Sequence, residues 1–221
     1  MPKKNVVETV TARVQMIRVL SPTVFALRLE RNDFKFLPGQ YVKLGFPGEF
    51  EMREYSVYSG SQDDFLELLI KEVKGGDMSP RLRKLRKGDT VILEGPLGSF
   101  IIREKDLKKQ FLFVGSGTGI APLHCFVESY PGINYRLIHG VRWSEELYDV
   151  ESYQPSRLVR CISGEKTEHF HGRVTDYLLR NRVPPDTLCY VCGNSDMICD
   201  VYDILGDHGV PPDNLNSEVY F

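Results

Sequence analysis

The spacing of apolar residues changes near the middle of the 221-residue chain, and this change constrains the fold more than any other feature. In the first half, apolar residues alternate with polar ones over short stretches bounded by glycine or proline turns, namely Phe25–Glu30, Val42–Phe46, Phe65–Val73 and Thr90–Leu93. Alternation with a period of two is typical of half-buried strands. Several short strands at this spacing predict a small antiparallel β-barrel.

The second half has a different pattern, in which short apolar runs alternate with helix-like segments. The runs are Phe111–Val114, Tyr135–His139, Leu158–Ile162 and Leu188–Val191. The clearest helix begins at the Asn194-Ser195 cap signal, carries Met197, Val201 and Leu205, and ends at Gly209. This alternation predicts a Rossmann-like parallel sheet with right-handed crossovers and a ligand crevice at the carboxyl ends of its strands. We therefore expect two domains, residues 1–105 and 106–221, joined in the polar stretch Arg103–Lys109.

Composition excludes several classes of protein. The formal net charge is −2, whereas a protein that binds nucleic acid over its whole surface has a strongly basic domain. No run approaches the roughly 20 apolar residues of a membrane helix, and Met1–Arg18 lacks the apolar core of a signal peptide. The five cysteines are irregularly spaced in a chain long enough to fold without disulfides. We expect a cytoplasmic protein, a monomer or weak dimer, that binds neither membrane nor nucleic acid.

The charge is unevenly distributed along the chain. Residues 1–107 carry 18 basic and 15 acidic side chains, a net charge of +3, which leaves −5 for residues 108–221. The densest basic stretch contains Arg81, Arg83, Lys84, Arg86 and Lys87. Such a stretch is either a solvated helix face or a docking surface for an acidic partner, where charge raises the association rate and fixes orientation.

A glycine-rich segment, Gly115–Pro122, directly follows the apolar run Phe111–Val114 and leads into a helix-like segment. Glycines at this place let the backbone turn sharply and approach a pyrophosphate at the helix N-terminus. A plain tight turn is the alternative. After the next predicted strand the sequence reads His139-Gly140-Val141-Arg142, with no acidic residue for a ribose 2′-hydroxyl; an arginine there suits a 2′-phosphate.

Two further segments have simpler interpretations. In Gly75–Pro80, Ser79 is a good N-cap for a helix over Arg81–Leu85, and the amides freed at such an end can also bind an anion. Cys189 and Cys192 form a C-x-x-C pair, but residues three apart in a strand point to opposite faces, so joint chelation is geometrically poor. We expect no metal site.

Several motifs together resemble the ferredoxin–NADP⁺ reductase family, in its compact bacterial branch. Arg53, Tyr55, Ser56 and Ser59 spell the family's R-x-Y-S-x-x-S flavin signature. The resemblance continues, in the family's order and over nearly the whole chain, through Gly76–Ser79, Gly95–Phe100, Gly117–Pro122, Cys192–Met197 and the terminal Glu218–Phe221. It implies a barrel domain that binds FAD, followed by an α/β domain that binds NADP(H).

The resemblance also implies roles for residues at the flavin. Arg53 would pair with the FAD pyrophosphate, Tyr55 would lie against the isoalloxazine, and Ser56 would hydrogen-bond the nitrogen that accepts the hydride. The remaining implied flavin-binding residues are Val57, Tyr58, Ser59, Gly76, Asp77, Met78 and Ser79.

At the nicotinamide, Cys192 would sit beside the ring and Glu218 would act as an acidic group near the flavin edge. Tyr220 would stack on the flavin until nicotinamide displaces it, and Phe221 would pack on the FAD adenine; the alternative is that both simply belong to a packed tail. The loop residues implied to hold the nicotinamide cofactor are Gly117, Thr118, Gly119 and Pro122.

One departure from the family concerns the nucleotide. NADPH-selective members usually end the third strand in a Ser-Arg pair, whereas this chain reads Ser163-Gly164-Glu165-Lys166. Arg142, Lys166 and Arg173 remain as candidate ligands of the 2′-phosphate, so NADPH is favoured and NADH stays open.

The expected activity is hydride transfer between NADPH and bound FAD, with single electrons passing to ferredoxin or flavodoxin as an acidic carrier that docks near Arg81–Lys87. The alternatives are an NAD(P)H:flavin reductase, an oxygenase reductase component, and a non-catalytic flavin-binding electron-transfer subunit.

Overall fold

The computed structural model describes residues 7–220, and these residues form two compact units. One, the barrel unit, contains the described residues up to Ile101 together with His124–Ser129. The other, the parallel-sheet unit, contains Ile102–Leu123 and the described residues from Tyr130 onward. None of the helices in the described part of the chain is long and apolar enough to cross a membrane.

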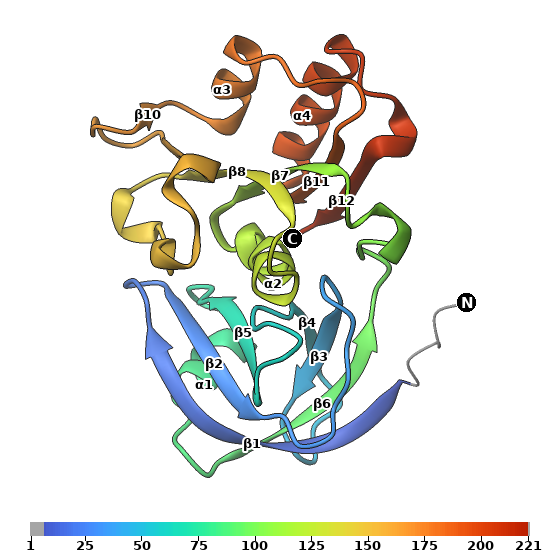
Figure 1. Ribbon diagram of the computed structural model, residues 1–221. Coiled ribbons are helices and arrows are strands. Elements are labelled where there is room, and N and C mark those ends of the chain that lie inside the picture. The colour runs from blue at the N-terminus through green and yellow to red at the C-terminus, as the bar shows by residue number, and fades with distance from the viewer. Residues whose placement is uncertain (1–6, 221) are drawn as a thin grey trace. The chain divides into compact units, whose positions relative to one another are not determined.

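The barrel unit is built on an antiparallel sheet with strand order β4-β3-β6-β1-β2-β5 (Figure 1). A backbone bridge between Val57 and Leu68 links the two ends of the sheet, so the barrel is nearly closed. The elements are β1 (Glu8–Val19), β2 (Val24–Glu30), β3 (Tyr41–Gly45), β4 (Met52–Ser56), β5 (Phe65–Lys71), α1 (Met78–Arg83) and β6 (Thr90–Leu97). The predicted barrel is confirmed.

Alternating apolar residues fill the barrel. Phe25, Leu27 and Leu29 of β2 and Leu66 and Leu68 of β5 belong to a buried cluster that also includes residues of β3, β6 and α1. The expectation that β2 is only half-buried is wrong at its start, because Val24 to Leu27 are all buried. The outer face of β2 is therefore covered as well as its inner face.

The parallel-sheet unit has strand order β10-β9-β8-β7-β11-β12, and every pairing in it is parallel (Figure 1). Its strands are β7 (Gln110–Ser116), β8 (Asn134–Val141), β9 (Leu158–Ile162), β10 (Phe170–His171), β11 (Leu188–Gly193) and β12 (Leu215–Val219). Its helices are α3 (Val174–Arg180) and α4 (Ser195–Asp207), and α2 (Ala121–Ser129) begins here and ends in the barrel unit. The predicted Rossmann-like sheet is confirmed.

The order of the strands fixes where a ligand can bind. The chain moves outward from β7 through β8 and β9, then returns to the other side of β7 as β11. In open α/β sheets, ligands bind at the carboxyl ends of the two strands where the order reverses. This point lies between β7 and β11, where Gly117 directly follows β7 and Asn194 directly follows β11.

The helix predicted after Asn194 is confirmed as α4. The Asn194 side chain accepts hydrogen bonds from the backbone N–H groups of Asp196 and Met197, as expected of an N-cap. Val201 and Leu205 are buried, and Gly209 follows the helix with φ +90°. That positive φ explains why a glycine follows the end of the helix.

Candidate functional site

The flavin-signature segment begins on β4. Arg53 is exposed and forms an ion pair with Glu51. Tyr55 packs against the barrel core, and burial raises the pKa of its hydroxyl to about 12 despite the opposing effect of the Arg53 charge. Ser56 is buried at the end of the strand. Arg53 thus presents a guanidinium at the surface. Two residues later, Tyr55 presents an aromatic side chain whose hydroxyl stays neutral.

The second half of this segment leaves β4 and attaches to β5. Val57 lies in the barrel core, and Tyr58 stacks on His124 with ring centroids 4.0 Å apart. The Ser59 hydroxyl accepts a hydrogen bond of 3.0 Å from the backbone N–H of Glu67. These three side chains are buried, so any contact that they make with a flavin comes in addition to a structural role.

The Gly76–Ser79 loop leads into α1 differently from the prediction. The helix begins at Met78 with Asp77 at the N-cap position, and the Ser79 hydroxyl instead accepts a hydrogen bond of 2.9 Å from the backbone N–H of Val73. The predicted Ser79 cap is therefore wrong: its hydroxyl reaches back to the preceding strand connection. Asp77 is exposed and pairs with Arg81, 2.9 Å away.

Part of the basic stretch is neutralised within the barrel unit. Arg81 binds Glu49 and Asp77, and Arg83 binds Glu72 and the carbonyl of Pro22. Lys84, Arg86 and Lys87 are exposed. The accessible positive charge of this stretch therefore lies after α1.

In the parallel-sheet unit, the glycine loop approaches the end of β11 too closely for any side chain. A Cβ atom on Gly119 would lie 2.4 Å from the carbonyl oxygen of Cys192. A Cβ atom on Gly193 would lie 2.2 Å from the Ser116 hydroxyl oxygen, and that hydroxyl accepts a hydrogen bond of 3.4 Å from the Asn194 N–H. The loop and the end of β11 therefore touch through the backbones of Gly119 and Cys192 and through the Ser116 hydroxyl.

This cradle, formed by the Gly117–Pro122 loop and the end of β11, fits a dinucleotide. Gly117 has φ +53° and open space around its Cα, and it opens the turn that leads into α2 with Pro122 as the second helical residue. Glycine at these positions leaves room for a ligand's phosphates to approach the backbone, and the first amides of a helix attract negative charge. Thr118 lies in the same turn.

His139 supports the loop and was missed by the sequence analysis. Its Nε2 lies 2.9 Å from the Gly117 carbonyl oxygen, and since a carbonyl can only accept, Nε2 carries the proton. Burial lowers the pKa of His139 to about 4, outweighing the opposing effects of Gly117 and Glu146. The imidazole is therefore neutral near pH 7. The sequence signal was a histidine at the end of the apolar run Tyr135–His139.

The structure brings Cys192, Glu218 and Tyr220 together. Cys192 and Glu218 are partners in the register of β11 and β12, and the Tyr220 N–H donates to the Gly193 carbonyl at 2.8 Å. The Cys192 thiol is fully buried; burial, reinforced by the Glu218 charge, holds its pKa well above the usual value, although a hydrogen bond with the Tyr220 side chain opposes the shift. Cys192 is thus an uncharged thiol. Phe221 lies outside the described residues.

The three cations expected at a 2′-phosphate are exposed on different loops. Arg142 follows β8 and stacks on Trp143, Lys166 follows β9, and Arg173 precedes α3. The loops after β8 and β9 touch, because the Gly164 N–H donates to the Arg142 carbonyl at 2.7 Å.

Glu165 lies in the same loop pair. Its carboxylate accepts bonds of 2.6 Å from both the N–H and the hydroxyl of Ser144, and these bonds lower its pKa. A fixed negative charge therefore accompanies the three cations.

The five cysteines have no disulfide partner. Within residues 7–220, no group of three or more His, Cys, Asp or Glu side chains is arranged to hold a metal ion.

Comparison with known proteins identifies both units. Residues 9–102 match the oxidoreductase FAD-binding domain, and residues 113–203 match the oxidoreductase NAD-binding domain. The toluate 1,2-dioxygenase electron transfer component of Pseudomonas putida is 31% identical over 226 residues, which cover 95% of this chain and 67% of that protein. The ferredoxin–NADP reductase of Azotobacter vinelandii is 26% identical over 230 residues, which cover 88% of this chain and 89% of that protein.

Solved structures show the same fold. A cytochrome P450 reductase from Amycolatopsis superimposes with a TM-score of 0.85 at 27% identity, over 96% of this chain and 70% of that chain. The matched domains account for FAD and for a nicotinamide dinucleotide as cofactors, and the relatives are electron-transfer reductases. The chain belongs to the ferredoxin–NADP⁺ reductase family of FAD-dependent oxidoreductases.

Proposed function

We propose that this protein transfers a hydride between NADPH and FAD and single electrons between FAD and a ferredoxin or flavodoxin. The observation that carries the proposal is the grouping of Cys192, Glu218 and Tyr220 beside the glycine cradle, at the reversal point of the parallel sheet. When bound, FAD supplies the conversion between two-electron and one-electron chemistry. The protein's task is to bind, orient and balance charge.

Each group of residues has one part of that task. Arg53 binds the FAD pyrophosphate with its planar guanidinium, and Ser56 donates a hydrogen bond at the reacting edge of the flavin. Tyr55 offers a neutral aromatic face, as its pKa of about 12 ensures at physiological pH. Cys192 is a fully buried, uncharged thiol, and once the nicotinamide displaces Tyr220 it offers a small polarisable surface that does not repel a hydride. Glu218 holds a carboxyl group beside that thiol.

The nucleotide is proposed as NADPH because Arg142, Lys166 and Arg173 are exposed on the loops where the ribose end would lie. Glu165 favours NADH instead, since a carboxylate repels a 2′-phosphate. The ratio of kcat/KM for NADPH to that for NADH decides between them. A ratio above 1 supports NADPH, and a ratio below 1 overturns this part of the proposal.

In this proposal the FAD-binding domain spans residues 1–105 and the NAD(P)H-binding domain spans residues 106–221. The carrier docks on the exposed cations after α1. The carrier is acidic, so its attraction to Lys84, Arg86 and Lys87 would speed association at low salt.

The direct test is anaerobic. The purified protein should be yellow, and NADPH or NADH should bleach its flavin; ferredoxin or flavodoxin should then restore the colour. Bleaching by neither nucleotide contradicts the proposed enzyme. A colourless protein whose flavin is removed by simple dialysis, and which reduces added free flavin, would instead be an NAD(P)H:flavin reductase.

A second candidate is the reductase component of an oxygenase. The observation that favours it is the 31% identity with an electron transfer component of a dioxygenase. The chemistry at FAD is the same, and the difference lies in the acceptor. Faster turnover with the ferredoxin or oxygenase of an aromatic dioxygenase system than with housekeeping ferredoxins and flavodoxins would select this second candidate.

A further inference from the structure

Strand β5 carries a buried carboxylate where its neighbours are apolar. The strand reads Phe65-Leu66-Glu67-Leu68-Leu69-Ile70-Lys71, and Glu67 is only 3% exposed. Leu66, Leu68 and Ile70 point into the barrel core, so Glu67 lies on the opposite face of the strand. Among the described residues of the barrel unit, it is the one buried carboxylate.

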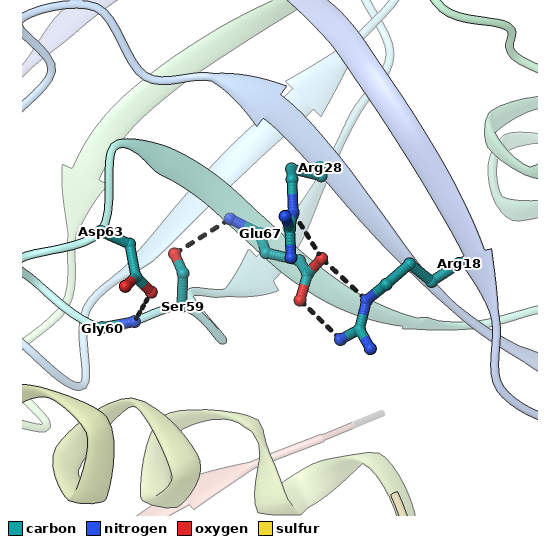
Figure 2. Close-up of polar contacts among 6 residues, drawn as sticks. All are labelled: Arg18, Arg28, Ser59, Gly60, Asp63 and Glu67. Carbon is teal, nitrogen blue, oxygen red and sulfur yellow. Dashed lines mark hydrogen bonds and ion pairs between the residues drawn. The ribbon is translucent and has the colours of Figure 1, made fainter. Parts of the chain in front are cut away.

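Two arginines hold this carboxylate, as Figure 2 shows. Arg18 donates from Nε to Oε1 at 3.1 Å and from Nη2 to Oε2 at 2.8 Å. Arg28 donates from Nε to Oε1 at 3.0 Å, and its guanidinium also lies 3.5 Å from the centroid of the Phe65 ring. Two cations facing one anion give this Arg18–Glu67–Arg28 triad a formal charge of +1.

The backbone of the same residue holds the flavin-signature segment. The Glu67 carbonyl accepts from the N–H groups of Tyr58 at 2.8 Å and Ser59 at 3.3 Å, while its own N–H donates to the Ser59 hydroxyl (Figure 2). Directly afterwards, the Gly60 N–H donates to Asp63 at 2.8 Å and closes the turn. The triad therefore sits where the segment passes from β4 to β5.

Stability alone does not call for a charged triad here. Moving ions out of water carries a large desolvation cost, and well-packed apolar residues are often as stabilising as a buried ion pair. Removing only the carboxylate is different, because it leaves two guanidiniums facing each other. The charge of the triad also acts over a longer range than its hydrogen bonds, since partly buried charges are weakly screened.

We propose that Glu67, through Arg18 and Arg28, is a positioning residue for the flavin: it anchors Tyr58 and Ser59 and sets the local charge at which the bound flavin is reduced. This inference rests on the proposed role of the Arg53–Ser59 segment in binding FAD. Greater positive charge beside the flavin stabilises its electron-rich reduced form, whereas less positive charge destabilises it.

A series of charge variants tests this directly. The triad has a formal charge of +1 in the wild type, 0 in Arg28→Gln, +2 in Glu67→Gln and +1 again in the double variant. The readouts are the midpoint potential of the bound flavin and the Kd for FAD, measured on the intact 221-residue chain. The matched control is Glu30→Gln on β2, which removes the same charge from an exposed pair with Arg13, 3.8 Å away.

We expect Glu67→Gln to raise the potential and Arg28→Gln to lower it, each by about a tenfold change in the reduction equilibrium, with the double variant close to wild type. The Kd for FAD should rise about tenfold in both variants that lack Glu67, because the ion pairs that fix residue 67, whose backbone holds Tyr58 and Ser59, are lost whatever the charge. Glu30→Gln should change neither readout. If Glu67→Gln does not fold, the downward shift in Arg28→Gln, which keeps the Arg18–Glu67 pair, decides the question.

Potentials that stay at the wild-type value in the folded variants, or that shift in the same direction in both single variants, would overturn the inference. The proposed function fails separately, if neither nucleotide bleaches the flavin of the wild-type protein.

Discussion

The two units present ligand-binding groups in opposite ways. In the barrel unit, the candidate site rests on charged side chains in ion pairs: Arg53 with Glu51, Arg81 with Glu49 and Asp77, and the Arg18–Glu67–Arg28 triad. In the parallel-sheet unit, it rests on a close approach of the loop to the end of β11, which is possible because Gly119 and Gly193 lack side chains and which one neutral histidine supports. Under the proposed function, a dinucleotide would thus meet ion-paired side chains in the barrel unit and, at the Gly117–Pro122 loop, closely packed backbone in the parallel-sheet unit.

This difference predicts different responses to substitution. Electrostatic interactions change gradually with charge and, where exposed, weaken with salt. Close-packed backbone contacts do not weaken gradually in this way, because an inserted methyl group must displace atoms that are themselves fixed.

Replacing Gly119 should have the largest effect. In Gly119→Val the new Cβ would overlap the Cys192 carbonyl, 2.4 Å away, so the cradle must open. We expect the KM for the nicotinamide nucleotide to rise more than about 100-fold, while the FAD content stays at the wild-type level. The control is Gly206→Ala on α4, where nothing lies within 4 Å of the new methyl group. A wild-type KM in Gly119→Val would refute the steric interpretation.

Ser56→Ala should slow reduction of the bound flavin by about 100-fold, because one donor directed at developing charge has an effect of that size. Stopped-flow absorbance under anaerobic conditions measures the rate. The nucleotide Kd from the same experiment serves as the internal control and should not move. An unchanged rate would remove Ser56 from the chemistry.

His139→Phe removes the hydrogen bond to Gly117, whereas His139→Gln can keep a donor. We expect the phenylalanine variant to raise the nucleotide KM about tenfold with little change in kcat, as the loss of one buried hydrogen bond of about 1.5 kcal/mol would do. The glutamine variant should recover much of the affinity. A fall in kcat at constant KM would contradict a role confined to the loop.

The same histidine makes stability depend on pH. Its pKa is about 4 in the folded protein and 6.5 in its unperturbed form, so between these values the unfolded chain binds more protons. The free energy of unfolding should therefore decrease as the pH falls from 6.5 to 4, by about 3 kcal/mol from this residue, and not further below. Urea titrations at several pH values across this range give the free energy of unfolding at each pH. In His139→Gln, this free energy should change less steeply with pH than in the wild type. Equal slopes would disprove the assignment.

Charge reversal on the exposed side of the barrel unit should have the smallest effect. Lys84→Glu with Lys87→Glu should lower kcat/KM for an acidic carrier several-fold at low salt and hardly at all at about 0.5 M salt, where the screening length is a few ångströms. Lys105→Glu with Lys108→Glu changes the net charge equally in the other unit and provides the control. Equal losses in both pairs would show a general charge effect rather than docking.

Much of the fold could be predicted because local patterns specified it. Leu158–Ile162 matches β9 in full, and the cap signal at Asn194 marks the start of α4. The longest strand, β1, was missed because a bulge between Val14 and Met16 breaks its period of two. Strand β12 was missed because Asn216, Ser217 and Glu218 make it polar, and only its pairing with β11 identifies it.

The site was predictable to the extent that motifs are contiguous. Cys192 and Glu218 were singled out separately, and the register of β11 and β12 explains why they meet. His139 and Glu67 could not be recognised, since their partners are distant: Gly117 is 22 positions away, and Arg18 is 49 positions away. The one local sign was a polar residue within an apolar run for Glu67 and at the end of one for His139.

Helix α2 has a consequence for anyone who divides this protein into fragments. Its last six residues belong to the barrel unit, where Cys125 joins the core and Phe126 lies against Phe100 and the backbone of Gly39. A fragment cut near residue 105 would lack these side chains and expose the barrel surface that they cover. Separately expressed halves should therefore aggregate or bind each other. A barrel fragment extended through Ser129 should aggregate less.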